Sequence, residues 1–233
     1  MNRYDVLING ESCIKKGILP VKRIDVPGAK KKYKEFDIAG IDGKYYEDTG
    51  FYDDIKLSVG FNYLVKETEW YKKFTECKRF FYNTETIRFT DDERDCFYKV
   101  KKIEVGTNER KTKKIGKVTI TFICDPYSYL STGLNEYDIE DVLQNDYELS
   151  KPIYKISGVG ECEVTINGYS FSLTINGSIN IDTDLMIAYD NDLNSMNDAI
   201  SLDYDEIYLI EGKNTFSINE GFSCKVIPNW RVK

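Results

Sequence analysis

The sequence predicts a mainly β fold, with two β-sandwich domains and a single α-helix. Short runs of alternating apolar and polar residues recur along nearly the whole chain, which is typical of half-buried strands. One segment alone, about residues 67–82, has its apolar residues at helical spacing. Tyr and Phe, which favour strands, occur 18 and 12 times among the 233 residues. Together these observations predict a globular β protein.

The first domain is expected over residues 1–130, and its clearest hairpin lies early. Residues Ile38–Lys66 begin with a turn-rich, tyrosine-rich stretch and continue into a strand. That strand has five apolar residues on one face: Leu57, Val59, Phe61, Tyr63 and Val65. The basic run 29–34 before it is interpreted as a solvated loop, because no aromatic and basic platform for nucleic acid recurs around it.

The helix is expected over about 67–82, directly after this strand. Its apolar stripe is largely aromatic and consists of Trp70, Tyr71, Phe74, Cys77, Phe80 and Phe81. Lys, Glu, Thr and Arg fill the opposite face, so the stripe is expected to pack against the sheet.

Three further strands complete the first domain. The strands are expected at Thr86–Phe89, Cys96–Val105 and from Val118 to Cys124, where Asp125-Pro126 ends the last one. In the second of these the buried set shifts phase, which predicts a bulge near Lys101-Lys102.

The second domain is expected over residues 150–233, after an acidic, weakly patterned connection at 131–149. A two-residue turn at Asn167-Gly168 would pair Ile166 with Tyr169 and place every apolar residue on one face, which predicts a type I′ hairpin. A similar turn at Asn176-Gly177 would put the next apolar residues on the wrong face. There we expect a three-residue connection or a crossing to the opposite sheet.

The two halves of the chain differ in charge. Residues 1–130 carry 26 Lys and Arg against 21 Asp and Glu, a net charge of +5, whereas residues 131–233 carry 6 against 18, a net charge of −12. The asymmetry fits either two ordinary solvated surfaces or docking against partners of opposite sign.

Composition also excludes much ordinary chemistry. Histidine is absent, which removes Ser-His and Cys-His nucleophile pairs and histidine metal ligands. Asp190, Asp192 and Asn194 begin like a calcium loop, but Ser195 and Ser201 stand where the glycine and the glutamate are needed, so we interpret a polar loop. We expect no catalytic residue, no cofactor and no metal site.

The six cysteines are expected to be buried, reduced thiols, because none forms a C-x-x-C pair and several lie on apolar faces. With no signal peptide and no apolar run of membrane length, we expect the chain to fold in a reducing cytosol.

Several short motifs occur in a distinctive order. The first half has I-N-G, V-P-G, I-A-G-I-D-G and a tyrosine-rich stretch to F-Y-D-D, and it ends in I-T-F-I-C-D-P-Y-S-Y. The second half has V-T-I-N-G, I-N-I-D-T-D, L-I-E-G-K-N-T-F and a final V-I-P-N-W-R. Over nearly the whole chain this order resembles the distal tail protein of bacteriophages with long, non-contractile tails.

The resemblance implies a structural function. Such proteins form a hexameric ring at the tip of the tail tube. A tail-tube-like β-sandwich with one helix builds the ring, and a galectin-like β-sandwich projects from it. The ring is a hub that joins the tail tube protein to the tail-associated spike or lysin, and in some phages to receptor-binding proteins. The protein would assemble in the cytoplasm of the bacterial host and reside in the virion, with neither a membrane nor sequence-specific nucleic acid as a partner.

Two other functions are compatible with parts of the sequence. A galectin-like shape suggests a carbohydrate-binding adhesion module, although fold alone does not license it. Trp230 could stack on a sugar or lie in the core of the closing strands. A glycoside hydrolase would use two of the 18 carboxylates of the second half, but no cleft-forming pattern is visible.

The ring suggests a subunit contact in the first half. A hairpin-like excursion over roughly 22–60 is longer than a compact domain needs, and we expect it to reach a neighbouring subunit. The contact is predicted at Tyr45, Tyr46, Phe51 and Tyr52. The alternative is an ordinary intramolecular hairpin whose tyrosines cover their own core.

Overall fold

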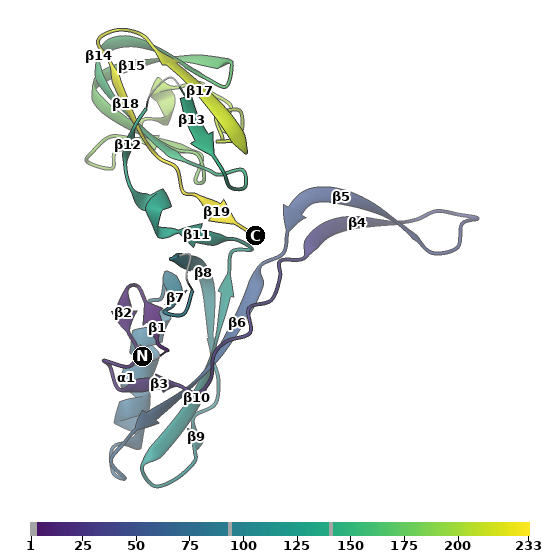
Figure 1. Cartoon of the computed structure of the whole chain (residues 1–233), viewed down its shortest axis with the longest axis vertical. Coiled ribbons are helices and arrows are strands. Elements are labelled where there is room, and N and C mark those ends of the chain that lie inside the picture. The colour runs from purple at the N-terminus through teal and green to yellow at the C-terminus, as the bar shows by residue number, and fades with distance from the viewer. Residues whose placement is uncertain (1–3, 93–94, 140–141) are drawn as a thin grey trace. The chain divides into compact units, whose positions relative to one another are not determined.

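The computed structural model describes residues 4–92, 95–139 and 142–233, and it confirms the predicted class. The protein is mainly β, with β-sandwich units and one α-helix among the described residues (Figure 1). The chain divides into two compact units, residues 1–128 with Lys233 and residues 129–232. The domain limits predicted from the sequence, 1–130 and 150–233, stay a proposal.

Unit 1 is built on a seven-stranded antiparallel path in the order β2-β1-β7-β8-β10-β6-β3, with β9 paired to β10. The bounds are β1 Val6–Ile8, β2 Glu11–Ser12, β3 Ile18–Pro20, β6 Ile55–Leu64, β7 Thr86–Phe89, β8 Cys96–Val105, β9 Glu109–Arg110 and β10 Ile115–Cys124. A separate two-stranded sheet is formed by β4, Lys31–Asp37, and β5, Lys44–Tyr52.

The centre of unit 1 is the ladder between β6 and β10. Their buried residues alternate on each strand and lie opposite one another, with Phe61 paired to Val118 and Leu57 paired to Phe122. The cross-strand pair of Gly116 and Tyr63 needs the glycine, because a Cβ at position 116 would lie 2.3 Å from the Tyr63 ring. The predicted bulge in β8 is confirmed: Ile123 pairs with Lys102 and Cys124 with Val100, which leaves Lys101 as the extra residue.

The helix α1, Trp70–Tyr82, starts three residues later than predicted and packs on this ladder through part of its aromatic stripe. Trp70, Cys77 and Phe81 are buried, and the Phe81 ring lies 4.9 Å from that of Phe61. Tyr71 does not belong to the buried stripe, because it is 81% exposed. Tyr71 follows Trp70 by one residue, which is a rotation of about 100° around the helix axis, so its side chain points away from the sheet.

Unit 2 is a β-sandwich whose core lies between a long hairpin and the strands and loop opposite. The hairpin is β14 Ile153–Ile166 with β15 Tyr169–Asp182, and the sheet order is β12-β18-β14-β15-β16, with β17 paired to both β13 and β14. The Tyr154 hydroxyl donates to the Ile207 carbonyl at 2.8 Å across this core. The other elements are β12 Tyr137–Asp138, β13 Val142–Asn145, β16 Ile187–Tyr189, β17 Gly212–Ile218, β18 Ser223–Ile227 and the 3-10 turns η1 Ser131–Leu134 and η2 Asn197–Ala199.

One predicted turn of unit 2 is confirmed and the other is wrong. Ile166 pairs with Tyr169, and Asn167 and Gly168 both have positive φ, as a type I′ turn requires. At Asn176-Gly177 there is no turn: Gly177 pairs with Gly158, and β15 continues to Asp182. The apolar residues Phe171 to Ile181 keep one phase through Gly177, so an unbroken strand satisfies the pattern without a crossing.

The segment 131–149, which was expected to be a connection, contains η1, β12 and β13. Two further short strands, β11 and β19, lie at the two ends of unit 2. Here β12 pairs with β18, and β13 pairs with β17. β11, Ser128–Leu130, pairs with β19, Arg231–Val232. Because these strands have two to four residues, their alternation is too short to be recognised without the partner strand.

The cysteines occupy buried positions, as the sequence predicts, except that Cys224 is only half-buried. Burial raises the pKa of Cys77 to about 11 and the pKa of Cys124 and Cys224 to about 12. The reactive thiolate is therefore scarce near neutral pH.

We accordingly expect at most one of the six thiols to react with a bulky disulfide reagent within minutes at pH 8. Folding raises the pKa of these thiols above the ordinary value of 9.0. Their contribution to the free energy of unfolding is therefore fully present below pH 9.0, and it is lost as the pH rises through the pKa values of the folded protein. In guanidinium chloride all six should react, which serves as the control. Fast labelling of four or more without denaturant would contradict the prediction.

Candidate assembly surface

The segment that the sequence singled out forms a two-stranded ribbon, which we call the arm and define as residues 31–52. It comprises β4, the turn 38–43 and β5, and it leaves the sheet of unit 1 next to β6 (Figure 1). Every residue of β4 is exposed, and β5 has only two half-buried residues. The hydrophobic core of unit 1 includes no residue of the arm. The arm thus contributes surface to the unit and almost nothing to its interior.

The location of this ribbon corrects two details of the sequence analysis. The basic run 29–34 belongs mostly to a strand and not to a loop, although its side chains are solvated as expected. The tyrosine-rich stretch, expected to be turn-rich, forms the strand β5, and the turn of the ribbon is at 38–43. The residues of β6 pair with β10 and not with the tyrosine-rich stretch. Sequence alternation missed β4 and β5 because neither has a buried face.

The four predicted contact residues occupy different places on the arm. Tyr45 pairs across the ladder with Phe36, and Tyr46 pairs with Glu35, so these two tyrosines point to opposite faces. Tyr45, Tyr46 and Phe51 are 57%, 55% and 71% exposed. Tyr52 lies at the root of the arm, where its ring is 6.0 Å from Tyr127. The structure therefore presents three of the four to solvent and leaves the fourth partly engaged within its own unit.

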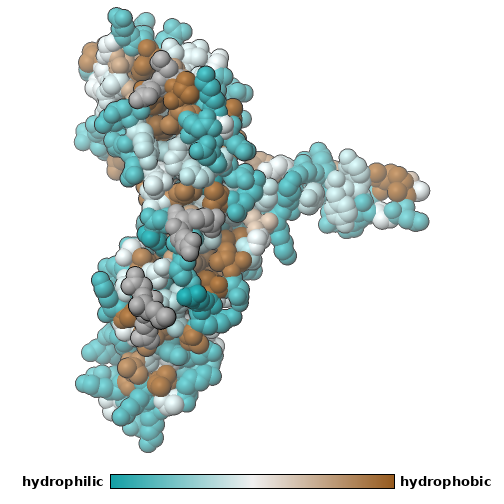
Figure 2. All heavy atoms as spheres, in the orientation of Figure 1, coloured by the Kyte–Doolittle hydropathy of each residue, from teal (hydrophilic) through white to brown (hydrophobic). Residues whose placement is uncertain are grey.

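Other aromatic and aliphatic side chains of the arm were not singled out by sequence reasoning. Tyr33 lies edge-on to Tyr46 with ring centroids 6.2 Å apart, and Phe36 lies 6.3 Å from Tyr45. At the tip, Ile38 is 45% and Ile41 is 64% exposed. Figure 2 shows the hydrophobic residues gathered at the end of the arm. The arm therefore has apolar side chains on both faces and at its tip.

Ion pairs hold the two strands in register. Lys31 Nζ lies 2.6 Å from Asp48 Oδ2, and Lys44 Nζ pairs with Glu35 Oε2. The hydrogen bond from Lys31 to Asp48 raises the pKa of Lys31 and lowers the pKa of Asp48, and the Gly50 N–H also donates to Asp48. The hydrogen bond from Lys44 to Glu35 likewise raises the pKa of Lys44. Exposed pairs of this kind add little stability, so they chiefly specify the register.

A kink at the root separates the arm from the sheet. Lys31 pairs with Tyr52 and Tyr33 pairs with Asp48, which leaves one residue on β4 opposite three on β5. Gly50 takes a φ of +75° within this bulge, and Thr49 Oγ1 donates to the Lys32 carbonyl at 2.8 Å. Such a bulge bends a ribbon and changes the direction of the strands beyond it.

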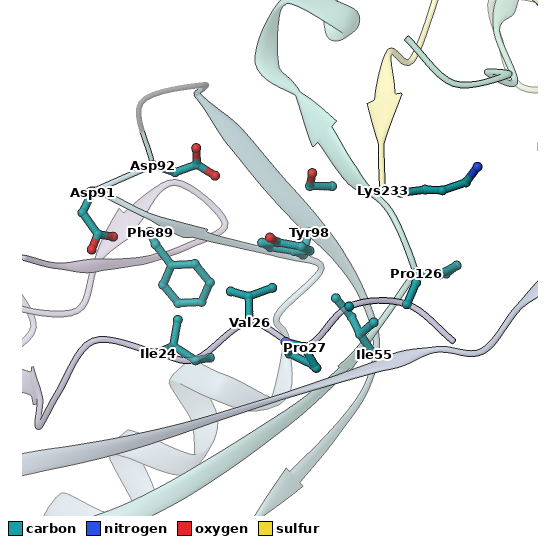
Figure 3. Close-up of a pocket in the computed structure, with 13 residues that line it drawn as sticks. Ile24, Val26, Pro27, Ile55, Phe89, Asp91, Asp92, Tyr98, Pro126 and Lys233 are labelled. Carbon is teal, nitrogen blue, oxygen red and sulfur yellow. The ribbon is translucent and has the colours of Figure 1, made fainter. Parts of the chain in front are cut away.

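A pocket of unit 1 lies close to the root of the arm. The segment 24–29, which has no regular secondary structure, lies beside the buried rings of Phe89 and Tyr98 (Figure 3). The pocket has a volume of about 460 Å³ and is also lined by Ile55, Asp91, Asp92, Pro126, Ser128 and Lys233. Its apolar side chains come from five separate stretches of the unit: 24–29, Ile55, Phe89, Tyr98 and Pro126.

The structure shows where the ligand candidates of the sequence analysis lie. No group of three or more metal-ligating side chains occurs in the described parts of the chain. The Asp190 carboxylate accepts hydrogen bonds from the Asp192 and Asn194 N–H groups and from the Asn194 amide, which is a closed polar turn. Trp230 is buried in the core of unit 2, as one of the two sequence interpretations predicted, and so does not offer a face to a sugar.

A membrane-crossing helix is likewise not found: within the described ranges, no helix has the length and apolar character that a bilayer requires.

Comparison with known proteins places the fold. No protein-family model matches the chain, and no curated protein matches it either. Among solved structures the chain is similar to the crystal structure of SPP1 Dit (gp 19.1), described as a paradigm of the hub adsorption apparatus in phages that infect Gram-positive bacteria. The TM-score is 0.64 at 14% sequence identity, and the match covers 97% of this chain and 98% of that chain. The resemblance to a phage distal tail protein is confirmed at the level of fold, over 97% of this chain.

Proposed function

We propose that this chain is a structural protein of a phage tail tip, where it forms a ring-shaped hub. The observation that carries the proposal is the likeness to SPP1 Dit over 97% of the chain. A likeness of both units in one alignment supports a shared use of the whole molecule more strongly than a likeness of one sandwich would, because single β-sandwiches serve many functions.

The arm supports self-association as the means of building the hub. An isolated two-stranded ribbon is only marginally stable in water, and this one has large apolar side chains on both faces. The alternative, in which the tyrosines cover their own core, does not fit the exposure of Tyr45, Tyr46 and Phe51. A neighbouring copy that covers these residues would stabilise the ribbon, and a repeated head-to-tail contact closes into a ring.

The proposed ring has six copies and joins the tail tube protein on one side to the spike or tail-associated lysin on the other, with receptor-binding proteins as further partners. The charge difference between the halves of the chain, +5 and −12, supports partners of different character for the two units. The protein would accordingly reside in the virion, at the tip of the tail.

Particle mass and shape test the proposal directly. In mass photometry, six copies of the 27.0-kDa chain should give a species of about 162 kDa, and negative-stain images should show six-fold rings. A dimer or tetramer without a central opening would contradict the hub. A chain that stays monomeric at micromolar concentration would contradict self-association altogether.

A further inference from the structure

The pocket beside the arm root has the properties of a receptor for an aliphatic group. Phe89, Tyr98 and Ile55 are buried and supply apolar surface to the pocket, whereas Val26 is 46% exposed. Figure 3 shows Ile24 and Val26 on one side of the space, with the rings of Phe89 and Tyr98 beside them. A volume of about 460 Å³ leaves room for more than one aliphatic side chain.

The tip of the arm offers such a group. Ile38 and Ile41 stand at the end of the ribbon, beyond the last paired residues Asp37 and Lys44. Gly40 and Gly43 have φ values of +85° and +86°, and the Ile41 N–H donates to the Ile38 carbonyl at 3.2 Å, so the tip has a defined turn. Two exposed isoleucines at a structured tip gain free energy when a partner buries them.

The tip cannot reach the pocket of its own chain. Ala29 lines the pocket and β4 begins two residues later, so the paired strand carries the tip about 20 Å away from it. The ladder between β4 and β5 would have to break before the chain could fold back. A second copy of the chain has no such restriction.

Charged residues at both elements already have partners within the chain. The pocket has Asp91 and Asp92 on one side and Lys233 on the other (Figure 3), and Asp91 Oδ2 lies 3.3 Å from Arg23 Nε. At the tip, Lys44 pairs with Glu35. The contact therefore depends on the apolar groups of the tip and the pocket.

We propose that the tip of the arm, with Ile41 as its anchor, inserts into the pocket formed by Ile24, Val26, Phe89 and Tyr98 of a neighbouring copy. The inference deepens the proposed function and rests on it. Each copy offers one tip and one pocket at different places on its surface, which is a heterologous contact of the kind that closes into rings.

Cysteine pairing tests the contact between copies. Val26→Cys and Ile41→Cys are made separately and mixed under mild oxidation, and products are separated without reductant. We expect a covalent dimer in the mixture and none in either variant alone, and the double variant should form a covalent ladder up to the size of the ring. The native cysteines give little background because five are buried and the sixth is half-buried. A dimer of Ile41→Cys alone would indicate a tip-to-tip contact and overturn the proposal.

A charge variant measures the contribution of the anchor. Ile41→Asp should raise the concentration needed for half-assembly about tenfold or more, because an isoleucine burial is lost. Leu64→Asp is the matched control, since Leu64 is 66% exposed on β6 and should leave assembly unchanged. If the Ile41→Asp variant assembles into rings at the same concentration as the wild type, and no mixed cross-link appears, the proposed pocket contact is wrong, but the proposed hub is not affected. A wild-type chain that never assembles would overturn both.

Discussion

Removal of the arm is expected to convert the assembled protein into monomers while both units stay folded. In the variant, residues 33–50 are replaced by Asn-Gly, which joins the remaining ends of β4 and β5 through a two-residue hairpin turn. The deletion removes most of the exposed aromatic side chains of the arm, which we expect a neighbouring copy to bury. Mass photometry should show loss of the large species.

Folding of the shortened chain serves as the control for this experiment. No arm residue belongs to the core of unit 1, so the unfolding temperature of the monomer should change by only about 2 °C. Tyr71→Ser removes an aromatic residue that is 81% exposed on α1 and should leave assembly intact. Persistence of the ring without the arm would show that the subunit contact lies elsewhere on unit 1.

A pair of phenylalanine substitutions should separate stability from assembly. Phe122→Ala removes a fully buried ring from the cluster with Phe81, whose centroid lies 6.1 Å away, and should lower the unfolding free energy of unit 1 by about 3–5 kcal/mol. Unit 2 has its own core and should unfold at an unchanged temperature. Calorimetry of the monomeric, arm-deleted background resolves the two transitions.

Phe51→Ala is the counterpart of that variant. Phe51 is 71% exposed, so its loss should change the unfolding free energy by less than about 0.5 kcal/mol and yet weaken assembly. Equal destabilisation by both substitutions would mean that Phe51 packs within its own chain. Unchanged assembly in Phe51→Ala would remove it from the contact.

Sequence patterns identified the strands with one buried face far better than the others. In β6 and β10 every second residue enters the core, and both were recognised. The bulge at Lys101 was equally visible, because a phase shift in buried residues has few other causes. Burial on one side is what alternation reports, so these strands could be found without the structure.

The arm shows where alternation fails as a guide. Its aromatic richness indicated a surface element. However, β4 has charged residues at five of seven positions and no buried face, so the tyrosine-rich stretch of β5 was interpreted as turn-rich and not as a strand. At Gly177 the dipeptide Asn-Gly suggested a turn, while the apolar phase across it already favoured a continuous strand. The apolar phase over the whole strand therefore determines the structure here, and the local turn preference of Asn-Gly does not.

The cross-strand ion pairs of the arm also bear on the protein before it assembles. A free ribbon exposes two strand edges, which are templates for amyloid-like stacking, and aromatic side chains raise that hazard. Lys31, Lys34 and Lys44 place cations along those edges, and an added strand would have to desolvate them or displace Asp48 and Glu35 from their pairs. Salt weakens this protection by screening the charges. Newly made chains should therefore remain soluble longest at low ionic strength, and they should aggregate through the arm when salt is high and neighbours are scarce.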